Sequence, residues 1–349
     1  MSPEHQEVNL ESSETEGDLS PYLLEARRAR AKVATATDLA GKKIVALKFG
    51  GSSLLGSDRL LHSARIVKNA AETSSVIVTV SAMKGVTDRL LRVAQHVANG
   101  EWDKAAREAE HIVQLHLDTL HDLHLPQEDR DRVAYELKLL SRDLLHETQK
   151  RGHKACDAVA MDRIASFGER FTSRLFAATL EKLDCLAVPV ASSDFVLTCD
   201  HFQNAQPHMD QTKWRGRDVL LPLLDAGIVP VVTGFIGATQ DGRITTLGRN
   251  SSDYSGAIVA HVVDAAELVI WTDVDGIYTG NPHVSGDAKL LHDMTYDEAH
   301  ALALAGAKVL HPQVLPLAAE TGMTVWVRNT FKPQQRGTRI AAKSKGGVA

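Results

Sequence analysis

The sequence is poor in cysteine and has no excess of positive charge. Its three cysteines, Cys156, Cys185 and Cys199, are odd in number and none stands in a CxxC pair. This excludes a disulfide scaffold and a thiolate metal site, and it is typical of a reducing compartment. With 44 acidic and 39 basic residues and a net charge of −5, the chain is not expected to bind nucleic acid or a membrane surface.

The sequence also shows no apolar run that predicts a membrane-spanning helix and no segment typical of a targeting peptide. The most apolar window, residues 219–237, is interrupted by Pro222 and Pro230. It therefore predicts a helix end, a turn and a buried strand rather than a spanning helix. The amino-terminal segment is rich in acid and has no Lys or Arg ahead of an apolar stretch, unlike secretory and transit peptides. We expect a cytoplasmic protein.

The chain is nevertheless long and apolar enough to fold. Its 349 residues, 44% of them apolar, suit either two lobes or one large α/β domain. Residues 1–40 are acidic and then basic, and residues 339–349 are basic and small. We expect both segments to be flexible tails. The basic part of residues 1–40 could also form a peripheral helix or an element that docks a partner. The domain itself is expected to span residues 43–338.

Short β-branched runs alternate with long amphipathic stretches. The expected strands cover residues 43–48, 75–80, 185–190, 228–234, 268–272 and 323–328. The expected helices cover residues 58–72, 87–99, 102–125, 128–151, 168–183, 211–226, 252–266 and 295–306. Strands that are apolar throughout are typical of a parallel sheet covered on both faces. The fold class is therefore α/β and doubly wound, with functional loops at the carboxyl ends of the strands.

Residues 102–151 form the one long stretch of helical pattern without a strand. The segment contains His111, His116, His121 and His124. His121 and His124 share a helix face, which would suit a metal ion. His111 and His116 are spaced five residues apart along the helix and do not lie on that face. We expect a helical-hairpin insertion whose histidines are solvated, and no metal site.

The first candidate for chemistry is the loop after residues 43–48. An apolar strand ends at Lys48, and Gly50, Gly51 and Ser52 follow before a helix. Glycines let backbone N–H groups approach an anion, and the helix amino terminus and Lys48 add positive charge. A structural turn beside a snorkelling lysine is the alternative reading. The loop is not a Walker A motif, because Ser57 stands where that motif needs lysine.

Two further strand-to-helix turns follow the same pattern. In the second, Ser81 and Gly85 precede a helix that we expect Thr87 to cap. In the third, Gly168 and Glu169 open a long amphipathic helix. Glu169 either complements the helix dipole or holds a substrate ammonium group.

The richest turn is the one before residues 252–266. It holds the run Arg249, Asn250, Ser251, Ser252 and Asp253. Arginine is suited to bidentate capture of a carboxylate, and the Asn-Ser-Ser turn to backbone contact with a phosphoryl group. Asp253 is placed to orient cationic side chains. This is more polarity than a helix cap requires, so it favours a functional site.

Two later motifs add carboxylates and a second lysine. Asp273 and Asp275 end a buried strand, where carboxylates can hold Mg²⁺ through water, and Tyr278 can stack on a base. A simple Asp-Gly turn is the alternative. Lys308 lies between a glycine and an expected helix and is a second candidate to bind phosphate.

Together these turns indicate phosphate chemistry. The chain contains no GxGxxG, HExxH, GxSxG or HRDxxxxN motif. Phosphoryl transfer needs mainly positioning and charge neutralisation. A carboxylate acceptor has a pKa of about 4, so at neutral pH it needs no general base. The absence of an obvious base therefore favours a carboxylate over an alcohol as acceptor.

The ordered motifs resemble aspartate kinase of the amino-acid kinase superfamily. They are KFGGSS, VSAMKGVTD, SFGERFTSRLFAA, GFIGATQDGRITTLGRNSSDYS, WTDVDGIYT and GAKVLHP, within residues 43–338. The residues of these motifs are most similar to those of the kinase part of bifunctional aspartokinase–homoserine dehydrogenases. The resemblance implies a three-layer α/β/α sandwich around a mainly parallel eight-stranded sheet. It also implies that residues 43–245 bind the amino acid and residues 246–338 bind ATP.

The resemblance implies a role for each candidate residue. Catalysis falls to Lys48, Asp253 and Lys308. Aspartate binding falls to Ser52, Ser81, Thr87, Glu169, Arg249, Asn250, Ser251 and Ser252. Nucleotide binding falls to Gly50, Gly51, Thr272, Asp273, Tyr278, His283, Lys308 and Val309. The implied substrates are L-aspartate and ATP with Mg²⁺, and the implied product is 4-phospho-L-aspartate, which leads toward lysine, threonine, methionine and isoleucine.

Three departures from the family pattern bear on this expectation. His283 stands where the family usually has arginine, and Ser251 stands where glycine is common. The sequence also shows no paired ACT sensor domains, so we expect no feedback inhibition through this chain. We expect a homo-oligomer, most simply a dimer, and a regulatory partner is left open. The alternative functions are a kinase for another small acid and a nucleotide-binding regulatory subunit.

Overall fold

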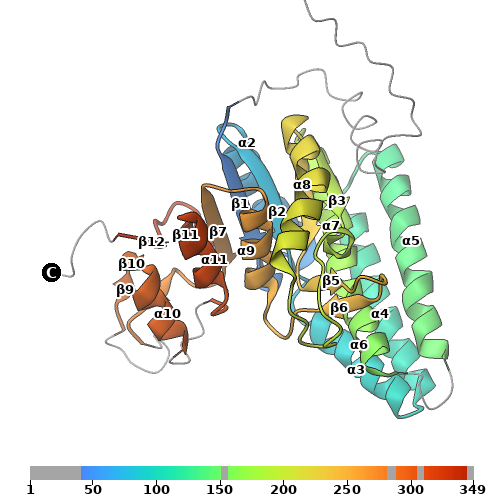
Figure 1. Cartoon of the computed structure of the whole chain (residues 1–349). Coiled ribbons are helices and arrows are strands. Elements are labelled where there is room, and N and C mark those ends of the chain that lie inside the picture. The colour runs from blue at the N-terminus through green and yellow to red at the C-terminus, as the bar shows by residue number, and fades with distance from the viewer. Residues whose placement is uncertain (1–40, 151–155, 281–287, 305–309, 344–349) are drawn as a thin grey trace, which may run out of the picture.

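An eight-stranded sheet forms the centre of the molecule (Figure 1). The computed structural model describes residues 41–150, 156–280, 288–304 and 310–343. The strand order is β10-β12-β11-β7-β1-β2-β4-β3. These strands are β1 Ile44–Phe49, β2 Ser75–Val80, β3 Ala187–Val190, β4 Val229–Thr233, β7 Glu267–Thr272, β10 Asp293–Thr295, β11 Thr324–Asn329 and β12 Thr338–Ala341. All pairings are parallel except β11 with β12, which confirms the predicted sheet.

Helices cover both faces of the sheet, as the apolar strands predict. One face packs against α2 Gly56–Ala71 and α7 Phe167–Glu181. Outside these two helices, and in the same apolar core, lie α3 Val86–Ala98, α4 Trp102–Asp122 and α5 Gln127–Gln149. The other face packs against α8 Met209–Asp225, α9 Ser252–Val262, α10 Tyr296–Leu304 and α11 Val314–Thr321. Side chains of β1 alternate between these two cores: Val45 and Leu47 lie in the first, and Ala46 lies in the second. The result is the expected three-layer α/β/α sandwich.

Two small hairpins, a short α-helix and two 3₁₀ helices, η1 Gly51–Ser53 and η2 Ser192–Asp194, complete the described fold. The hairpins pair β5 Ile236–Ala238 with β6 Ile244–Thr246, and β8 Ile277–Tyr278 with β9 Leu290–Leu291. The helix α6 Ala158–Ala165 packs on β6. These elements were not predicted, because each is too short to show a clear period in the sequence.

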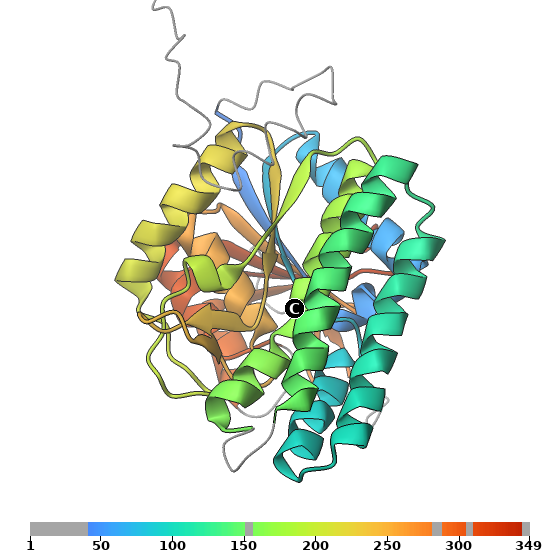
Figure 2. The ribbon, with the colours of Figure 1, turned by 90° about the vertical axis from the view of Figure 1, so that its right-hand side faces the viewer.

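The predicted helical insertion is present as the pair α4 and α5, which lie side by side on the outside of the molecule (Figure 2). The prediction that all its histidines are solvated is wrong for His116. Its ring is fully buried and stacks on Phe171 with ring centroids 4.7 Å apart. Burial lowers the pKa of His116 to about 4, so its ring is neutral at neutral pH. No group of three His, Cys, Asp or Glu side chains suited to a metal occurs in the described part of the chain.

The carboxy-terminal boundary also differs from the prediction. Residues 339–341 are not part of a flexible tail, because β12 (Thr338–Ala341) pairs with β10 and β11 inside the main sheet. The sequence signal is weak there, since β12 is only four residues long and includes Arg339. The predicted tail over residues 1–40 lies outside the described residues.

The apolar window over residues 219–237 divides as predicted. The helix α8 ends at Asp225, and β4 begins at Val229 after a turn at Gly227. Among the helices of the described residues, none combines the length and apolar character that a membrane span requires.

Candidate functional site

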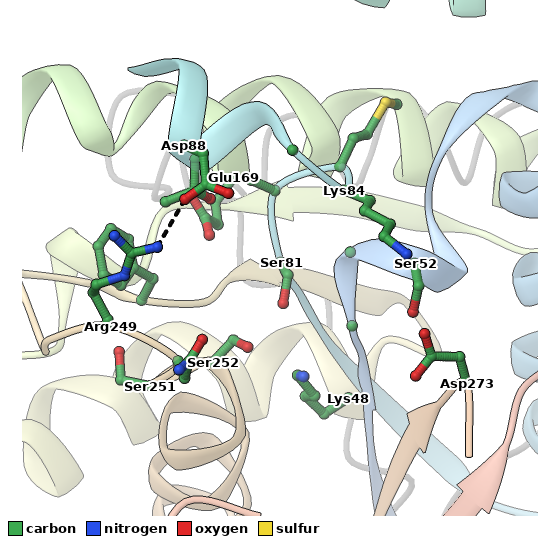
Figure 3. A pocket seen from close by; sticks show the side chains of 18 residues that line it. Lys48, Ser52, Ser81, Lys84, Asp88, Glu169, Arg249, Ser251, Ser252 and Asp273 are labelled. Atoms are coloured by element: carbon green, nitrogen blue, oxygen red, sulfur yellow. Dashed lines mark hydrogen bonds and ion pairs between the residues drawn. The ribbon is translucent and has the colours of Figure 1, made fainter. Parts of the chain in front are cut away.

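A cleft of ≈ 350 Å³ opens at the carboxyl ends of β1 and β2 (Figure 3). The amino termini of α3, α7 and α9 meet at this edge, so backbone N–H groups and polar loop residues converge there. Twelve predicted site residues line it: Lys48, Gly50, Gly51, Ser52, Ser81, Thr87, Glu169, Arg249, Asn250, Ser251, Ser252 and Asp273. Turns that are far apart in the sequence therefore form one site.

Lys48 lies at the floor of this cleft and is 5% exposed. It has the same parity along β1 as Ala46, so its side chain projects toward the layer that contains α9. There its Nζ lies 2.6 Å from Oδ1 of Asp253 in the first turn of α9. Gly256 makes room for it, because a Cβ at that position would lie 3.0 Å from the Lys48 Cβ. The cleft therefore has a buried, oriented ammonium group at its base.

The glycine loop packs against the loop that follows β2. A Cβ on Gly51 would lie 2.5 Å from the Ala82 carbonyl oxygen and 3.1 Å from the Lys84 nitrogen, so only glycine fits. The Gly50 N–H donates to the Trp271 carbonyl at 3.2 Å, so it is not a donor available to a ligand. The loop thus brings the backbone at Gly51 and Ser52 to the edge of the cleft.

Glu169 and Ser81 present buried oxygen atoms to the cleft without a partner. Glu169, in the first turn of α7, is 3% exposed and its Oε2 accepts no hydrogen bond within the described structure. Burial raises the pKa of Glu169 to about 8, although the Ala82 N–H and the Lys48 charge act in the opposite direction. Ser81 Oγ is likewise buried and unpartnered. Buried polar atoms are rarely left unsatisfied, so these two indicate a ligand-binding surface.

The turn before α9 completes the cleft. Asn250 adopts a left-handed φ of 62°, and Ser251 is fully buried with an unpartnered Oγ. Arg249 extends across the opening, where its guanidinium lies 2.7 Å from Asp88 (Figure 3). Both partners are exposed, so this ion pair is weak and a ligand carboxylate can replace Asp88.

Not every predicted role is supported by the geometry. Thr87 lies in the cleft but does not cap α3, whose N-cap is Gly85 in a left-handed conformation. Asp275 is not free to bind a metal ion, because Asn329 and Lys332 donate to its carboxylate at 2.5 and 2.9 Å. The Lys332 hydrogen bond is the main reason that the pKa of Asp275 is lowered.

The remaining nucleotide candidates are not brought together here. Thr272 ends β7 and Tyr278 lies in the β8–β9 hairpin, and neither lines the cleft, whereas their neighbour Asp273 does. His283, Lys308 and Val309 lie outside the described residues.

Sequence reasoning missed two charged residues of the cleft, Lys84 and Asp88. Both occur in the motif VSAMKGVTD, which follows β2. Their position on either side of the turn at Gly85 was the available signal. It was overlooked because surface charges beside a turn are common and need no function.

An α/β sandwich with glycine and lysine at a strand end and a polar turn at a helix amino terminus is suited to binding a phosphorylated ligand. Residues 43–329 match the amino acid kinase family. The match covers most of the chain, and the chain belongs to this family.

Curated relatives and solved structures narrow the comparison. Lysine-sensitive aspartokinase 3 of Escherichia coli K12 is 32% identical over 303 residues, which cover 87% of this chain and 65% of the relative. Aspartokinase 3, chloroplastic, of Arabidopsis thaliana is 31% identical, with 84% and 52% covered. The crystal structure of E. coli aspartokinase III in complex with aspartate and ADP has a TM-score of 0.77 at 31% identity, with 87% and 66% covered. The chain thus spans between about half and two thirds of these relatives.

Proposed function

We propose that this chain is an aspartate kinase, which transfers the γ-phosphoryl group of ATP to the side-chain carboxylate of L-aspartate and forms 4-phospho-L-aspartate. The observation that carries the proposal is the set of three buried, unpartnered oxygens of Ser81, Glu169 and Ser251 in one cleft with the Lys48–Asp253 pair. Similarity to aspartokinases, one of them solved with aspartate and ADP, supports the choice of substrates.

The ends of the amino acid are recognised by opposite charges. Glu169 accepts the α-ammonium group, whose positive charge favours the ionised form of a carboxyl group that is otherwise held neutral by burial. Arg249 exchanges Asp88 for the α-carboxylate. Thr87, Ser81 and the 250–252 turn supply hydrogen bonds around them. This arrangement leaves the side-chain carboxylate facing the floor of the cleft.

The side-chain carboxylate is ionised at neutral pH and is itself the nucleophile. One of its oxygens forms a bond to the γ-phosphorus while the bond from that phosphorus to the β–γ bridging oxygen breaks, and ADP leaves. No proton needs to move. Lys48, oriented by its ion pair with Asp253, neutralises the transferring group. By family resemblance Lys308 shares this role.

The nucleotide belongs on the Asp273 side of the glycine loop, with residues 246–338 as its main support. By resemblance Gly50, Gly51, Thr272, Tyr278, His283 and Val309 contribute. In the described structure Asp273 is the one carboxylate of β7 and its following turn that lines the cleft, and one carboxylate suits Mg²⁺ that arrives with phosphates and keeps its waters. Bound Mg²⁺ would neutralise charge on the phosphates.

The test is to incubate the purified protein with ATP, Mg²⁺ and hydroxylamine, which traps an acyl phosphate as a hydroxamate. L-Aspartate, L-glutamate and N-acetyl-L-aspartate are compared. Hydroxamate from L-aspartate alone supports the proposal, because Glu169 requires a free ammonium group. Product from the N-acetylated acid instead assigns the scaffold to another small acid. ATP binding without product from any acid makes the chain a nucleotide-binding regulatory subunit.

A further inference from the structure

Lys84 differs from the other cations of the cleft in having no acidic partner. Lys48 is paired with Asp253 at 2.6 Å, and Arg249 is paired with Asp88 at 2.7 Å. No carboxylate of the described residues lies within ion-pair distance of the Lys84 ammonium group. Lys84 therefore brings a positive charge to this part of the cleft that no carboxylate of the described residues neutralises in an ion pair.

The backbone of Lys84 is fixed to the glycine loop. Its N–H donates to the Gly51 carbonyl at 3.0 Å, and Val86 N–H donates to Met83 carbonyl at 2.9 Å across the turn. Gly51 packs so closely against the backbone of Ala82 and Lys84 that the two loops have no room to move toward each other. The point from which the side chain extends is thus set by the same loop that is proposed to bind phosphate.

The side chain of Lys84 extends back over that loop. Figure 3 shows its ammonium group directed toward Ser52, on the side of the cleft where Asp273 lies and away from Arg249 and Glu169. The proposed amino-acid end and the Lys84 end are therefore opposite ends of the cleft. A ligand group that meets Lys84 belongs to the nucleotide.

Charge balance gives the reason for a cation here. A triphosphate brings several negative charges, whereas the Lys48–Asp253 and Arg249–Asp88 pairs are each neutral and Asp273 adds a further negative charge. We propose that Lys84 binds the terminal phosphates of ATP from the outer side of the glycine loop. This inference rests on the proposed function for the identity of the nucleotide, and it adds a phosphate-binding residue to that site.

The experiment measures binding of ATP and of AMP, each with Mg²⁺ and without an acceptor acid, by calorimetry on the full chain. Lys84→Met is compared with Lys138→Met, a matched loss of one exposed lysine on the distant helix α5. We expect Lys84→Met to bind ATP about tenfold more weakly, as the loss of one charge-assisted contact implies. AMP affinity stays within twofold, Lys84→Arg restores ATP binding, and Lys138→Met behaves as wild type.

Three results would overturn the inference: unchanged ATP affinity in Lys84→Met, an equal loss of ATP and AMP affinity, or a rise in the KM for aspartate without a rise in that for ATP. The first denies the contact, the second shows a packing role, and the third places Lys84 at the amino acid. Because binding is measured without an acceptor, a chain that phosphorylates no acid but needs Lys84 for ATP would refute the proposed function and leave this inference standing.

Discussion

At the scale of single residues, the carboxyl group of Glu169 has the most strongly shifted pKa in the cleft. It is almost fully buried at the amino terminus of α7, and burial raises its pKa from a usual value of 4.5 to about 8. The folded chain therefore holds the proton more tightly than the unfolded chain. The contribution of the protonated Glu169 carboxyl group to stability is fully present below its unfolded pKa of 4.5. It is lost as the pH rises through the folded pKa of about 8.

We predict that Glu169→Gln removes this pH dependence. Between pH 6 and pH 9 the ligand-free wild type should lose on the order of 2 kcal/mol of unfolding free energy that Glu169→Gln does not lose. Urea unfolding at the two pH values measures the difference. Glu110→Gln, at an exposed position of α4, is the matched control and should follow the wild type. If Glu169→Gln and the wild type lose the same unfolding free energy, burial does not raise the pKa of the Glu169 carboxyl group.

Several residues that line the cleft could be singled out in the sequence, because their residue types are tied to position. Glycine, lysine and serine at the end of a strand have few structural reasons to occur together, so Lys48, Gly51 and Ser81 could be found from the sequence. The partner of each charge could not be found in this way. The pair of Arg249 with Asp88 joins residues 161 positions apart, and only the fold brings them together.

At the scale of elements, the glycine loop and the β2–α3 loop form one unit. We predict that Gly51→Ala costs about 2 kcal/mol of stability, because its Cβ would meet backbone atoms of Ala82 and Lys84, which cannot turn aside as a side chain can. Nucleotide affinity should fall with it. Thermal unfolding and ATP titration measure both. Gly280→Ala, which would meet nothing within 4 Å, is the control, and equal behaviour of the two variants would contradict the contact.

A second link between elements holds the turn of Arg249. Asp162 in α6 is 1% exposed, and it accepts hydrogen bonds at 2.8 Å from the Gln203 N–H and from both the N–H and hydroxyl of Thr246 in β6. Its pKa is raised by burial, which these donors oppose. This carboxylate therefore fixes β6 three residues ahead of Arg249.

We predict that Asp162→Asn destabilises the protein by about 1–3 kcal/mol, because one amide oxygen replaces two acceptors and the NH₂ group faces donors. Chemical denaturation measures the cost. Asp157→Asn is the matched control in the same helix: Asp157 caps α6 through the Ala160 N–H, and asparagine caps equally well. A cost for Asp157→Asn as large as that for Asp162→Asn would argue against the link.

Most of the sheet strands that were predicted are buried on both faces, as is β2, all of whose residues are buried. The missed strands are β10, which lies at the edge of the sheet, and its neighbour β12. Both contain charged residues, and they are three and four residues long. Short edge strands lack a continuous apolar run, so their place in the sheet is decided by pairing rather than by local sequence.

At the scale of the whole molecule, a mildly acidic chain builds a local cluster of cations. The net charge of −5 hides Lys48, Lys84 and Arg249, which the sheet topology brings to one edge. Fold class was predictable from the alternation of strands and helices. The location of positive charge was predictable only in part: Lys48 and Arg249 were singled out in the sequence, whereas Lys84 was missed because its place depends on which strand ends are neighbours.

The most direct test of the account is hydroxamate formation from L-aspartate by the wild type and by Lys48→Ala, with ATP and Mg²⁺. Lys48→Ala should lower kcat about 100- to 1,000-fold, since a preorganised charge at the transferring group is lost. Its thermal unfolding should stay that of a folded protein, and Lys138→Ala should keep wild-type turnover. Turnover of Lys48→Ala near that of the wild type would contradict the assignment of this cleft as the site of phosphoryl transfer.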